Sequence, residues 1–118
     1  MTGLDRLVGA LFGPGVAEIE SAEARKLLES EGRLIVIDVR QPAEFRSGHL
    51  PGAVSWPLIG GGDPLAEWLS ADRIIVVCAS GHRSQIGGRR LLKAGAKRVV
   101  SLRGGTAGWR AGGGATQS

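Results

Sequence analysis

The chain has 118 residues, of which 42% are hydrophobic, with a formal net charge of +4 and one cysteine. A chain of this length forms one compact domain and buries about two thirds of its unfolded surface without disulfides or metals. The lone Cys78 excludes an internal disulfide and favours a reducing compartment, so we expect a cytoplasmic protein. No apolar run reaches the roughly 18 residues of a membrane-spanning helix, so we expect no membrane association.

The charges divide the chain unevenly. All 11 acidic residues lie at or before Asp72, whereas nine of the 15 basic residues lie from Arg73 onward. The first part therefore sums to −5 and the rest to +9. A basic half fits nucleic acid, an acidic partner or an anionic substrate, and it fits a solvated basic helix face equally well.

Residues 1–15 form an N-terminal segment whose apolar residues repeat with helical spacing. They are Leu4, Leu7, Val8, Leu11 and Phe12. We expect a short amphipathic helix that packs against the domain, in preference to one that contacts a second subunit or a membrane surface. Asp5 beside Arg6 and the break at 13–15 argue against a secretory signal.

From residue 16 to residue 112, short apolar runs alternate with helical patterns, which predicts one α/β domain. Five runs are strand candidates: Val16–Ile19, Leu34–Val39, Ala53–Trp56, Ile74–Cys78 and Arg98–Leu102. We therefore predict a central, mainly parallel five-stranded sheet flanked by helices on both faces. The second and fourth runs should be the central strands, because continuous apolar character indicates burial on both faces.

The helices are predicted from residues that cap or break them. The four segments are 22–30 behind Ser21, 42–48 from Pro42 to Gly48, 65–69 behind Pro64, and Ser84–Ala94 before Gly95. Beyond Ala111 the sequence is rich in glycine and offers little apolar surface to bury. We therefore expect residues 113–118 to form a flexible tail.

The segment that carries chemistry is 74–84, a buried strand that runs through a tight loop into a helix. Ligands bind at the carboxyl ends of parallel strands, where a helix N-terminus directs several free N–H groups at one point. Cys78 opens this loop and Arg83 adds a fixed positive charge, so both effects favour thiolate over thiol. The loop residues after the cysteine are Ala79, Ser80, Gly81, His82, Arg83 and Ser84.

A free cysteine that ends a core strand is often simple packing. Here the neighbours favour function, because Gly81 allows unusual backbone angles and Arg83 supplies charge, and a structural cysteine needs neither. We therefore predict that Cys78 is a nucleophile in an anion-binding loop.

The run Cys-Ala-Ser-Gly-His-Arg-Ser resembles the active-site loop of the single-domain rhodanese sulfurtransferases. Further motifs support the resemblance: Val36-Ile37-Asp38-Val39-Arg40, Glu44-Phe45, Gly48-His49-Leu50-Pro51-Gly52-Ala53, and Leu102-Arg103-Gly104-Gly105 with Trp109. Together they cover residues 16–112 in the family's order and spacing, which implies a rhodanese-like fold for this range.

The resemblance also implies a mechanism without a cofactor. Cys78 would take a sulfane sulfur from a small anionic donor such as thiosulfate and pass it to cyanide, a thiol or a protein thiol. The N–H groups of 79–84 would stabilise the persulfide anion, and Arg83 would help to hold the donor. By the same comparison Asp38 and Arg40 would brace the loop as a supporting layer, and Glu44 would join them.

Loop length separates this hypothesis from its nearest chemical rival. The fold-related cell-cycle phosphatases and arsenate reductases enclose a larger anion with five residues between cysteine and arginine. Here only residues 79–82 intervene, and a tighter ring suits a single outer sulfur better than a tetrahedral phosphate.

The remaining residues are less informative. Two histidines, one cysteine and no clustered carboxylates make a metal site improbable. We expect His49 to order its loop by hydrogen bonds, whereas His82 either tunes donor choice or is simply exposed. No aromatic platform accompanies the basic residues Arg89, Arg90 and Lys93, so we expect no nucleic-acid partner.

Two glycines depart from the family, which more often has alanines at Gly87 and Gly88. Each costs about 1 kcal/mol of helix propensity relative to alanine. The helix therefore either packs very closely on the sheet or has loose first turns.

Two alternatives to an independent enzyme stay open at this point. The protein could be a sulfur carrier that delivers persulfide to a partner protein, or a non-catalytic rhodanese-like interaction module. The intact Cys78 and Arg83 argue against the second. The sequence allows a monomer or a homodimer.

Overall fold

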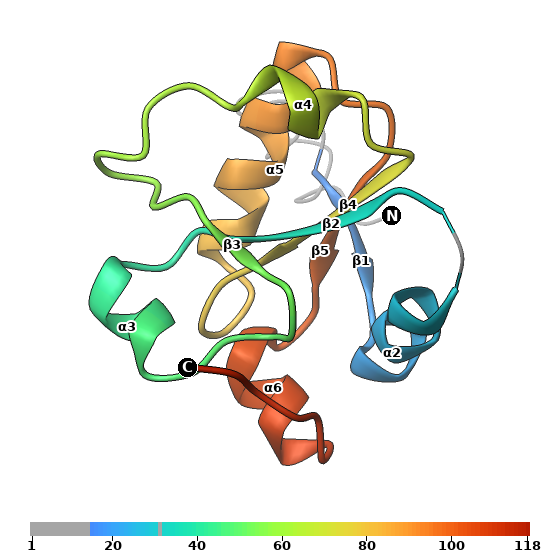
Figure 1. The fold of residues 1–118 in the computed structure, drawn as a ribbon, viewed down its shortest axis with the longest axis vertical. Coiled ribbons are helices and arrows are strands. Elements are labelled where there is room, and N and C mark those ends of the chain that lie inside the picture. The colour runs from blue at the N-terminus through green and yellow to red at the C-terminus, as the bar shows by residue number, and fades with distance from the viewer. Residues whose placement is uncertain (1–14, 31) are drawn as a thin grey trace, which may run out of the picture.

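The computed structural model describes residues 15–30 and 32–118, so the predicted N-terminal amphipathic helix lies outside the described residues. Strands and helices alternate along the described chain (Figure 1). The strands are β1 (Ala17–Ile19), β2 (Leu34–Asp38), β3 (Val54–Ser55), β4 (Arg73–Val77) and β5 (Val99–Leu102). The helices are α2 (Ser21–Glu29), α3 (Pro42–Arg46), α4 (Ala66–Leu69), α5 (Arg83–Ala94) and α6 (Gly105–Ala111).

The five strands form one sheet in the order β1-β5-β4-β2-β3. Every neighbouring pair is parallel, which confirms the predicted five-stranded parallel sheet. The apolar strand β4 lies at the centre, with β2 on one side and β5 on the other. Because all strands run the same way, the loops after β2, β4 and β5 leave the same edge of the sheet.

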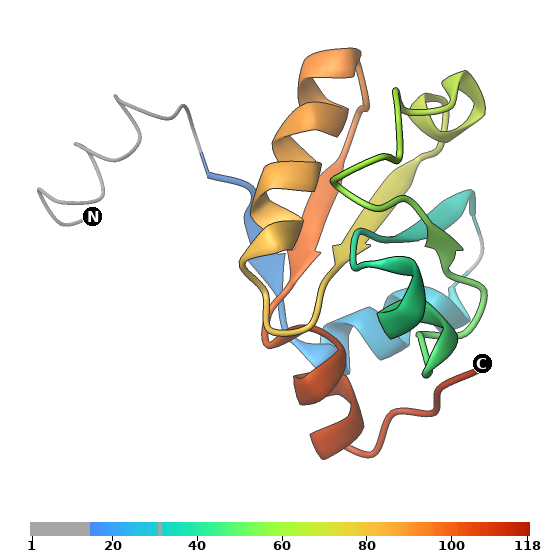
Figure 2. The same ribbon diagram turned by 90° about the vertical axis from the view of Figure 1, so that its left-hand side faces the viewer.

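Helices cover both faces of the sheet, as predicted, and Figure 2 shows α5 along one of them. On that face Ile37 and Val76 pack with Leu91 of α5 and Trp68 of α4. On the opposite face Val36, Ile75 and Val77 pack with residues of α2 and α6. Successive residues of one strand thus feed two separate apolar cores, as the alternation of side chains requires.

Helix α5 lies unusually close to the sheet. A Cβ atom on Gly87 would lie 2.8 Å from Val39 Cγ1, and one on Gly88 would lie 2.8 Å from Val16 Cγ2. Real Cβ atoms are not found so close to a neighbour. Of the two explanations offered for these glycines, close packing is confirmed.

The start of α2 differs from the prediction. The helix begins at Ser21, and Glu20 is the N-cap without a side-chain hydrogen bond. The predicted capping role of Ser21 is therefore wrong. Carboxylates and unpaired N–H groups interact favourably at a helix start, so acidic Glu23 in the first turn stabilises this end without a serine cap.

The sequence patterns did not predict α6, which contains two glycines in seven residues. Contacts with the loop after β4 explain why the helix forms. The Thr106 N–H donates to the Cys78 carbonyl at 2.8 Å, and the Ala107 N–H donates to the Ala79 carbonyl at 3.1 Å. Trp109 of the same helix is buried against the sheet.

Residues 113–118 make contacts with the domain that composition did not predict. Trp109 Nε1 donates to the Ala115 carbonyl at 2.8 Å. His49 and Gln117 exchange two backbone hydrogen bonds of 2.8 Å each. The backbone of this segment therefore runs beside α6 and the turn that follows α3.

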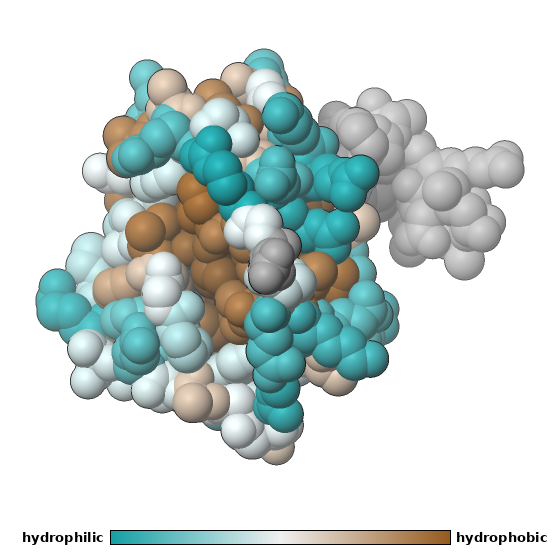
Figure 3. Space-filling view, turned by 45° about the vertical axis from the view of Figure 1, so that its right-hand side comes forward, coloured by the Kyte–Doolittle hydropathy of each residue, from teal (hydrophilic) through white to brown (hydrophobic). Residues whose placement is uncertain are grey.

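Apolar side chains with a polar rim gather on one face of the molecule (Figure 3). A hollow of about 270 Å³ lies beside β2 and includes Leu34, Ile35, Val54 and Trp68 in its wall. Among the helices in the described part of the chain, none has the length and apolarity needed to cross a membrane.

Candidate active site

Cys78 follows the last residue of the central strand, and α5 begins five residues later at Arg83. Its side chain is only 1% exposed and lies on the sheet face that α5 covers. The Gly81 N–H donates a hydrogen bond of 3.0 Å to Cys78 Sγ. The sulfur is thus directed into the turn of the loop, where a main-chain N–H group meets it.

Gly81 enables this turn. Its φ of 106° lies in the left-handed region that favours glycine. A Cβ atom here would approach the Gly104 nitrogen to 3.3 Å, because the glycine pair at the start of α6 lies against the loop. The residue is therefore required both for the backbone angle and for the close approach of another segment.

Ser84, in the first turn of α5, brings its side chain to the sulfur from the helix side. Its Oγ lies 3.6 Å from Cys78 Sγ and donates to the Gly81 carbonyl at 3.2 Å. It also lies 2.6 Å from the Oγ of Ser101 on β5. All three side chains are at most 1% exposed, so this network is shielded from water.

The environment of Cys78 has opposing effects on its ionisation. Burial raises the pKa of the thiol, but hydrogen bonds from the Ser84 side chain and from the backbone N–H groups of Ser84, Gly81 and Ser80 lower it. The net result is a pKa below the usual 9.0. The loop therefore favours the thiolate despite the burial.

Arg83 forms a two-pronged ion pair with Glu44 of α3. Its Nη1 and Nη2 atoms donate to Oε1 and Oε2 of Glu44 at 2.7 and 2.9 Å. The hydrogen bonds from Arg83 lower the pKa of Glu44 from 4.5 to about 2, although burial opposes this. The same contact raises the pKa of Arg83. Glu44 thereby holds the guanidinium at the rim of the loop.

Asp38 and Arg40 form a buried pair at the carboxyl end of β2. Arg40 Nη2 donates to Asp38 Oδ2 at 2.8 Å and to the Gly48 carbonyl at 2.8 Å. Their side chains are 0% and 4% exposed. The pair therefore braces the turn that follows α3, the helix that carries Glu44. These hydrogen bonds do not run to the cysteine loop itself.

The N-terminal end of α6 holds the loop from the other side, a contact that sequence analysis missed. Besides the two backbone bonds, Thr106 Oγ1 donates to the Cys78 carbonyl at 3.3 Å. Gly105 has a φ of 59°, and a Cβ atom on it would overlap the carbonyl oxygens of Cys78 and Ala79. The available signal was the glycine pair at 104–105 after a strand, but nothing local indicated its partner.

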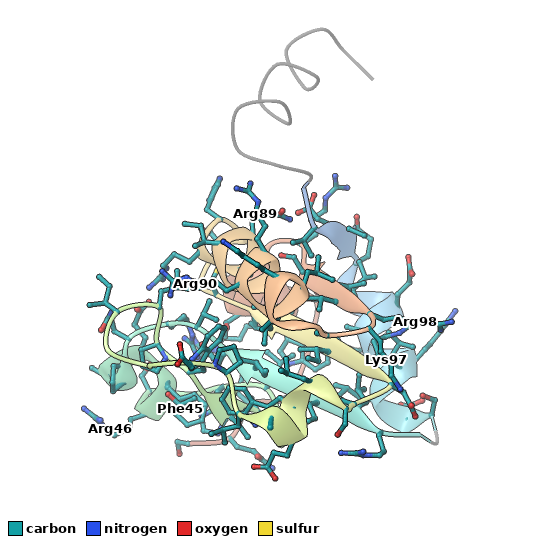
Figure 4. All side chains as sticks on the ribbon, turned by 90° about the horizontal axis from the view of Figure 1, so that it is seen from above. Phe45, Arg46, Arg89, Arg90, Lys97 and Arg98 are labelled. Carbon is teal, nitrogen blue, oxygen red and sulfur yellow. The ribbon has the colours of Figure 1, made fainter. Side chains whose placement is uncertain are left out.

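The other predicted residues lie further out. His82 and Ser80 are exposed and lie 3.3 Å apart through Nδ1 and Oγ. His49 Nδ1 lies 2.8 Å from the Phe45 carbonyl, and the two rings stack, so this histidine orders its turn as expected. Figure 4 shows Arg89 and Arg90 on α5, and Arg90 donates to the Leu58 carbonyl at 2.9 Å.

Within residues 15–30 and 32–118, no group of three or more potential ligands among His, Cys, Asp and Glu could hold a metal ion. The geometry instead describes one buried sulfur, donors directed at it, and an arginine at the rim.

Comparison with known proteins matches residues 20–112 to the model of the rhodanese-like domain. A candidate sulfur carrier protein of Bacillus subtilis is 33% identical over 95 residues, which are 80% of this chain and 51% of that protein. A sulfurtransferase of Allochromatium vinosum is 31% identical over 94 residues, 80% of this chain and 88% of that protein. The chain thus spans about half of the first relative and most of the second.

A solved structure gives the same result. The rhodanese-like domain of an Anabaena protein, determined in solution by NMR, superimposes with a TM-score of 0.75 at 30% identity. The superposition covers 86% of this chain and 78% of that one.

Proposed function

Because the chain belongs to the rhodanese-like domain family, we propose that it is a sulfurtransferase that carries a sulfane sulfur as a persulfide on Cys78. One observation carries the assignment: the 3.0 Å hydrogen bond from the Gly81 N–H to the sulfur. It supports a thiolate on Cys78 before transfer, and the other N–H groups of the loop would stabilise the persulfide, whose negative charge lies on the outer sulfur.

The first half of the reaction begins with the Cys78 thiolate. It attacks the outer sulfur of thiosulfate, a sulfur–sulfur bond forms to the cysteine, and the bond inside thiosulfate breaks. Sulfite leaves with the electron pair of that bond. In the second half, cyanide or a thiolate attacks the outer sulfur and the Cys78 thiolate leaves, so the enzyme ends as it began.

Arg83 suits the anionic donor. Its side chain is 36% exposed while it is paired with Glu44, so a small anion can reach it from solvent. A guanidinium has five N–H donors, so those that Glu44 does not use would bind the oxygens of a sulfonate-like group. In this proposal the backbone loop holds the sulfur and Arg83 holds the rest of the donor.

The test is the intact mass of the protein after incubation with thiosulfate. The natural chain should gain one sulfur atom that a reducing agent removes, and Cys78→Ser should gain none. The proposed function would be refuted if Cys78→Ser gained the sulfur. It would also be refuted if the natural chain gained none at any pH at which it stays folded.

A persulfide carrier is a second candidate, favoured by the similarity to the Bacillus protein. Both candidates use the same site and differ in the acceptor. Thiocyanate formation from cyanide and persulfide transfer to a protein thiol should therefore be measured side by side. An independent enzyme turns over cyanide or small thiols rapidly, whereas a carrier transfers to the protein thiol and turns over cyanide slowly.

A cysteine phosphatase is disfavoured by the site. With Ala79–His82 as the whole spacer, the Gly81 N–H already lies on the cysteine sulfur. A tetrahedral phosphate would need that donor and more space inside the ring. Hydrolysis of p-nitrophenyl phosphate that depends on Cys78 would count against sulfur transfer.

A further inference from the structure

The hydroxyl of Ser84 has more partners than hydrogens. A serine hydroxyl has one hydrogen to donate and two lone pairs to accept with. Around Ser84 Oγ lie Cys78 Sγ at 3.6 Å, the Gly81 carbonyl at 3.2 Å and Ser101 Oγ at 2.6 Å. A carbonyl only accepts, so the direction of the bond between Ser84 and Cys78 depends on whether the sulfur is a thiol or a thiolate.

Two states of the network follow from the ionisation of Cys78. As a thiol, Cys78 can donate to Ser84 Oγ while Ser84 donates to the Gly81 carbonyl. As a thiolate, the sulfur only accepts, so Ser84 must turn its single hydrogen from the carbonyl to the sulfur. In both states the single hydrogen of Ser84 is used elsewhere, so Ser84 accepts from Ser101 across the 2.6 Å contact and this bond keeps one direction.

We propose that Ser101 is a positioning residue for Cys78: it donates its hydroxyl hydrogen to Ser84 Oγ and thereby keeps the Ser84 hydroxyl directed at the thiolate or persulfide. The inference rests on the proposed function, because Cys78 is the sulfur carrier that the relay serves. It assigns to β5 a part in the site that the loop motif does not contain.

The backbone around Ser101 fixes the place of its hydroxyl group. Strand β5 pairs with β4 on one side and β1 on the other, and Ser101 is opposite Val76, two residues before Cys78. The side chain is 0% exposed, so no water competes for its hydrogen. A hydroxyl held by an inner strand donates in a fixed direction, which a solvent-exposed loop hydroxyl cannot do.

Charged groups near the sulfur come from other elements and do not replace this contact. Arg83 on α5 adds positive charge at the rim, and Glu44 on α3 pairs with it. Asp38 and Arg40 pair with each other at the end of β2, and His82 is exposed on the loop. Substitution of Ser101 leaves all of these charges in place.

The test is the titration of Cys78 in the Ser101→Ala variant, followed by thiolate absorbance and by the rate of alkylation against pH. The removal of one neutral hydrogen bond should raise the thiolate pKa by about half a unit to one unit. Ser84→Ala should raise it as much or more. In the double variant Ser101→Ala should add nothing, because Ser101 acts only through Ser84.

Ser101→Thr retains a hydroxyl and should keep the natural pKa, and Ser70→Ala, on the exposed end of α4, serves as a control for the loss of a serine hydroxyl. An unchanged pKa in Ser101→Ala, or an additive shift in the double variant, would overturn the relay. Neither measurement requires a sulfur donor. A failure of thiosulfate loading would therefore refute the proposed function and leave the relay result unaffected.

Discussion

Arg83 and Glu44 meet across the rim of the loop through two short hydrogen bonds, although each side chain is 36% exposed. Exposed ion pairs contribute little to stability, because water screens the charges and two long side chains lose freedom. The main effect of this pair is therefore on geometry. It fixes the guanidinium at the rim of the loop, and Glu44 is itself fixed by its bond with the Gln41 N–H at 3.0 Å.

The pair gives a pH-dependent contribution to stability. The pKa of Glu44 is lowered from 4.5 to about 2, so its contribution is present above pH 4.5 and is lost as the pH falls toward 2. We expect Glu44→Gln to lower the free energy of unfolding by less than about 1 kcal/mol near neutral pH. Urea unfolding of both proteins should show that the difference between their free energies of unfolding shrinks as the pH falls from 4.5 toward 2. A difference that grows in acid would contradict the assignment.

The shape of the Arg83 side chain should matter as well as its charge. Arg83→Lys keeps the charge and loses the fork that binds two oxygens at once. We expect the KM for thiosulfate to rise about threefold to tenfold, and Arg83→Ala to raise it further. Steady-state kinetics would test this. Equal KM values for lysine and alanine variants would show that the charge has no part in donor binding.

At the scale of elements, α5 brings two requirements together. Its N-terminal end must lie over the sulfur, and its middle must lie close enough to the sheet to seal the core. Gly87 and Gly88 allow the second requirement, since a methyl group at either position would meet a valine at 2.8 Å. The loss of helix propensity is offset by this close packing.

Gly87→Ala tests whether close packing outweighs helix propensity at this position. Alanine gains about 1 kcal/mol of helix propensity, but overpacking costs about 1–3 kcal/mol, and Val39 and Val76 cannot move far inside the core. We expect a net loss of stability in urea unfolding. Gly108→Ala in α6 is the matched control, because its Cβ would lie 3.6 Å from the Arg103 carbonyl oxygen, an ordinary contact, and the substitution should stabilise the protein.

A substitution in α6 tests whether the cysteine loop depends on contact with this helix. An alanine at Gly105 would overlap the carbonyl of Cys78 and would also need a φ of 59°. We expect Gly105→Ala to slow thiosulfate loading at least tenfold, because the loop must shift and the barrier depends on its N–H groups. The rate of mass gain measures this. Gly95→Ala shares a positive φ of 113° without a steric neighbour, so loading should stay near the natural rate.

In the whole molecule, folding brings opposite charges from the two halves of the chain together. The basic half pairs with the acidic half over long sequence separations: Arg83 with Glu44, and Arg103 with Glu20 at 2.9 Å. The Gly-rich end likewise joins distant parts, since Gln117 pairs with His49 and its side chain accepts from the Gly52 N–H at 3.0 Å.

Deletion of residues 114–118 should therefore reduce stability. It removes the acceptor of Trp109 Nε1 and the backbone pair with His49. With each net hydrogen bond worth about 0.5–1.5 kcal/mol and the entropy of the segment opposing it, we expect a loss of about 1–2 kcal/mol. Urea unfolding and the fluorescence of Trp109 would measure it. An unchanged midpoint and spectrum would show that the segment moves freely, as its composition predicts.

Local patterns in the sequence were enough to predict several features of the fold and the site. Continuous apolar runs predicted the inner strands, because a strand covered on both faces needs apolar residues throughout. The strand–loop–helix pattern around Cys78 predicted where the sulfur lies, because the carboxyl end of a parallel strand and a helix N-terminus meet there. The parallel five-stranded sheet, its helical layers and the family follow from these same residues.

The contacts between residues far apart in the chain became visible only in the folded molecule. Ser101 faces Ser84 because β5 lies beside β4, and α6 forms because the loop carbonyls accept its first N–H groups. Arg40 reaches the Gly48 carbonyl instead of the cysteine loop. The physical reason is that hydrogen-bond partners are chosen by position in space, whereas propensity and periodicity report only on neighbours along the chain.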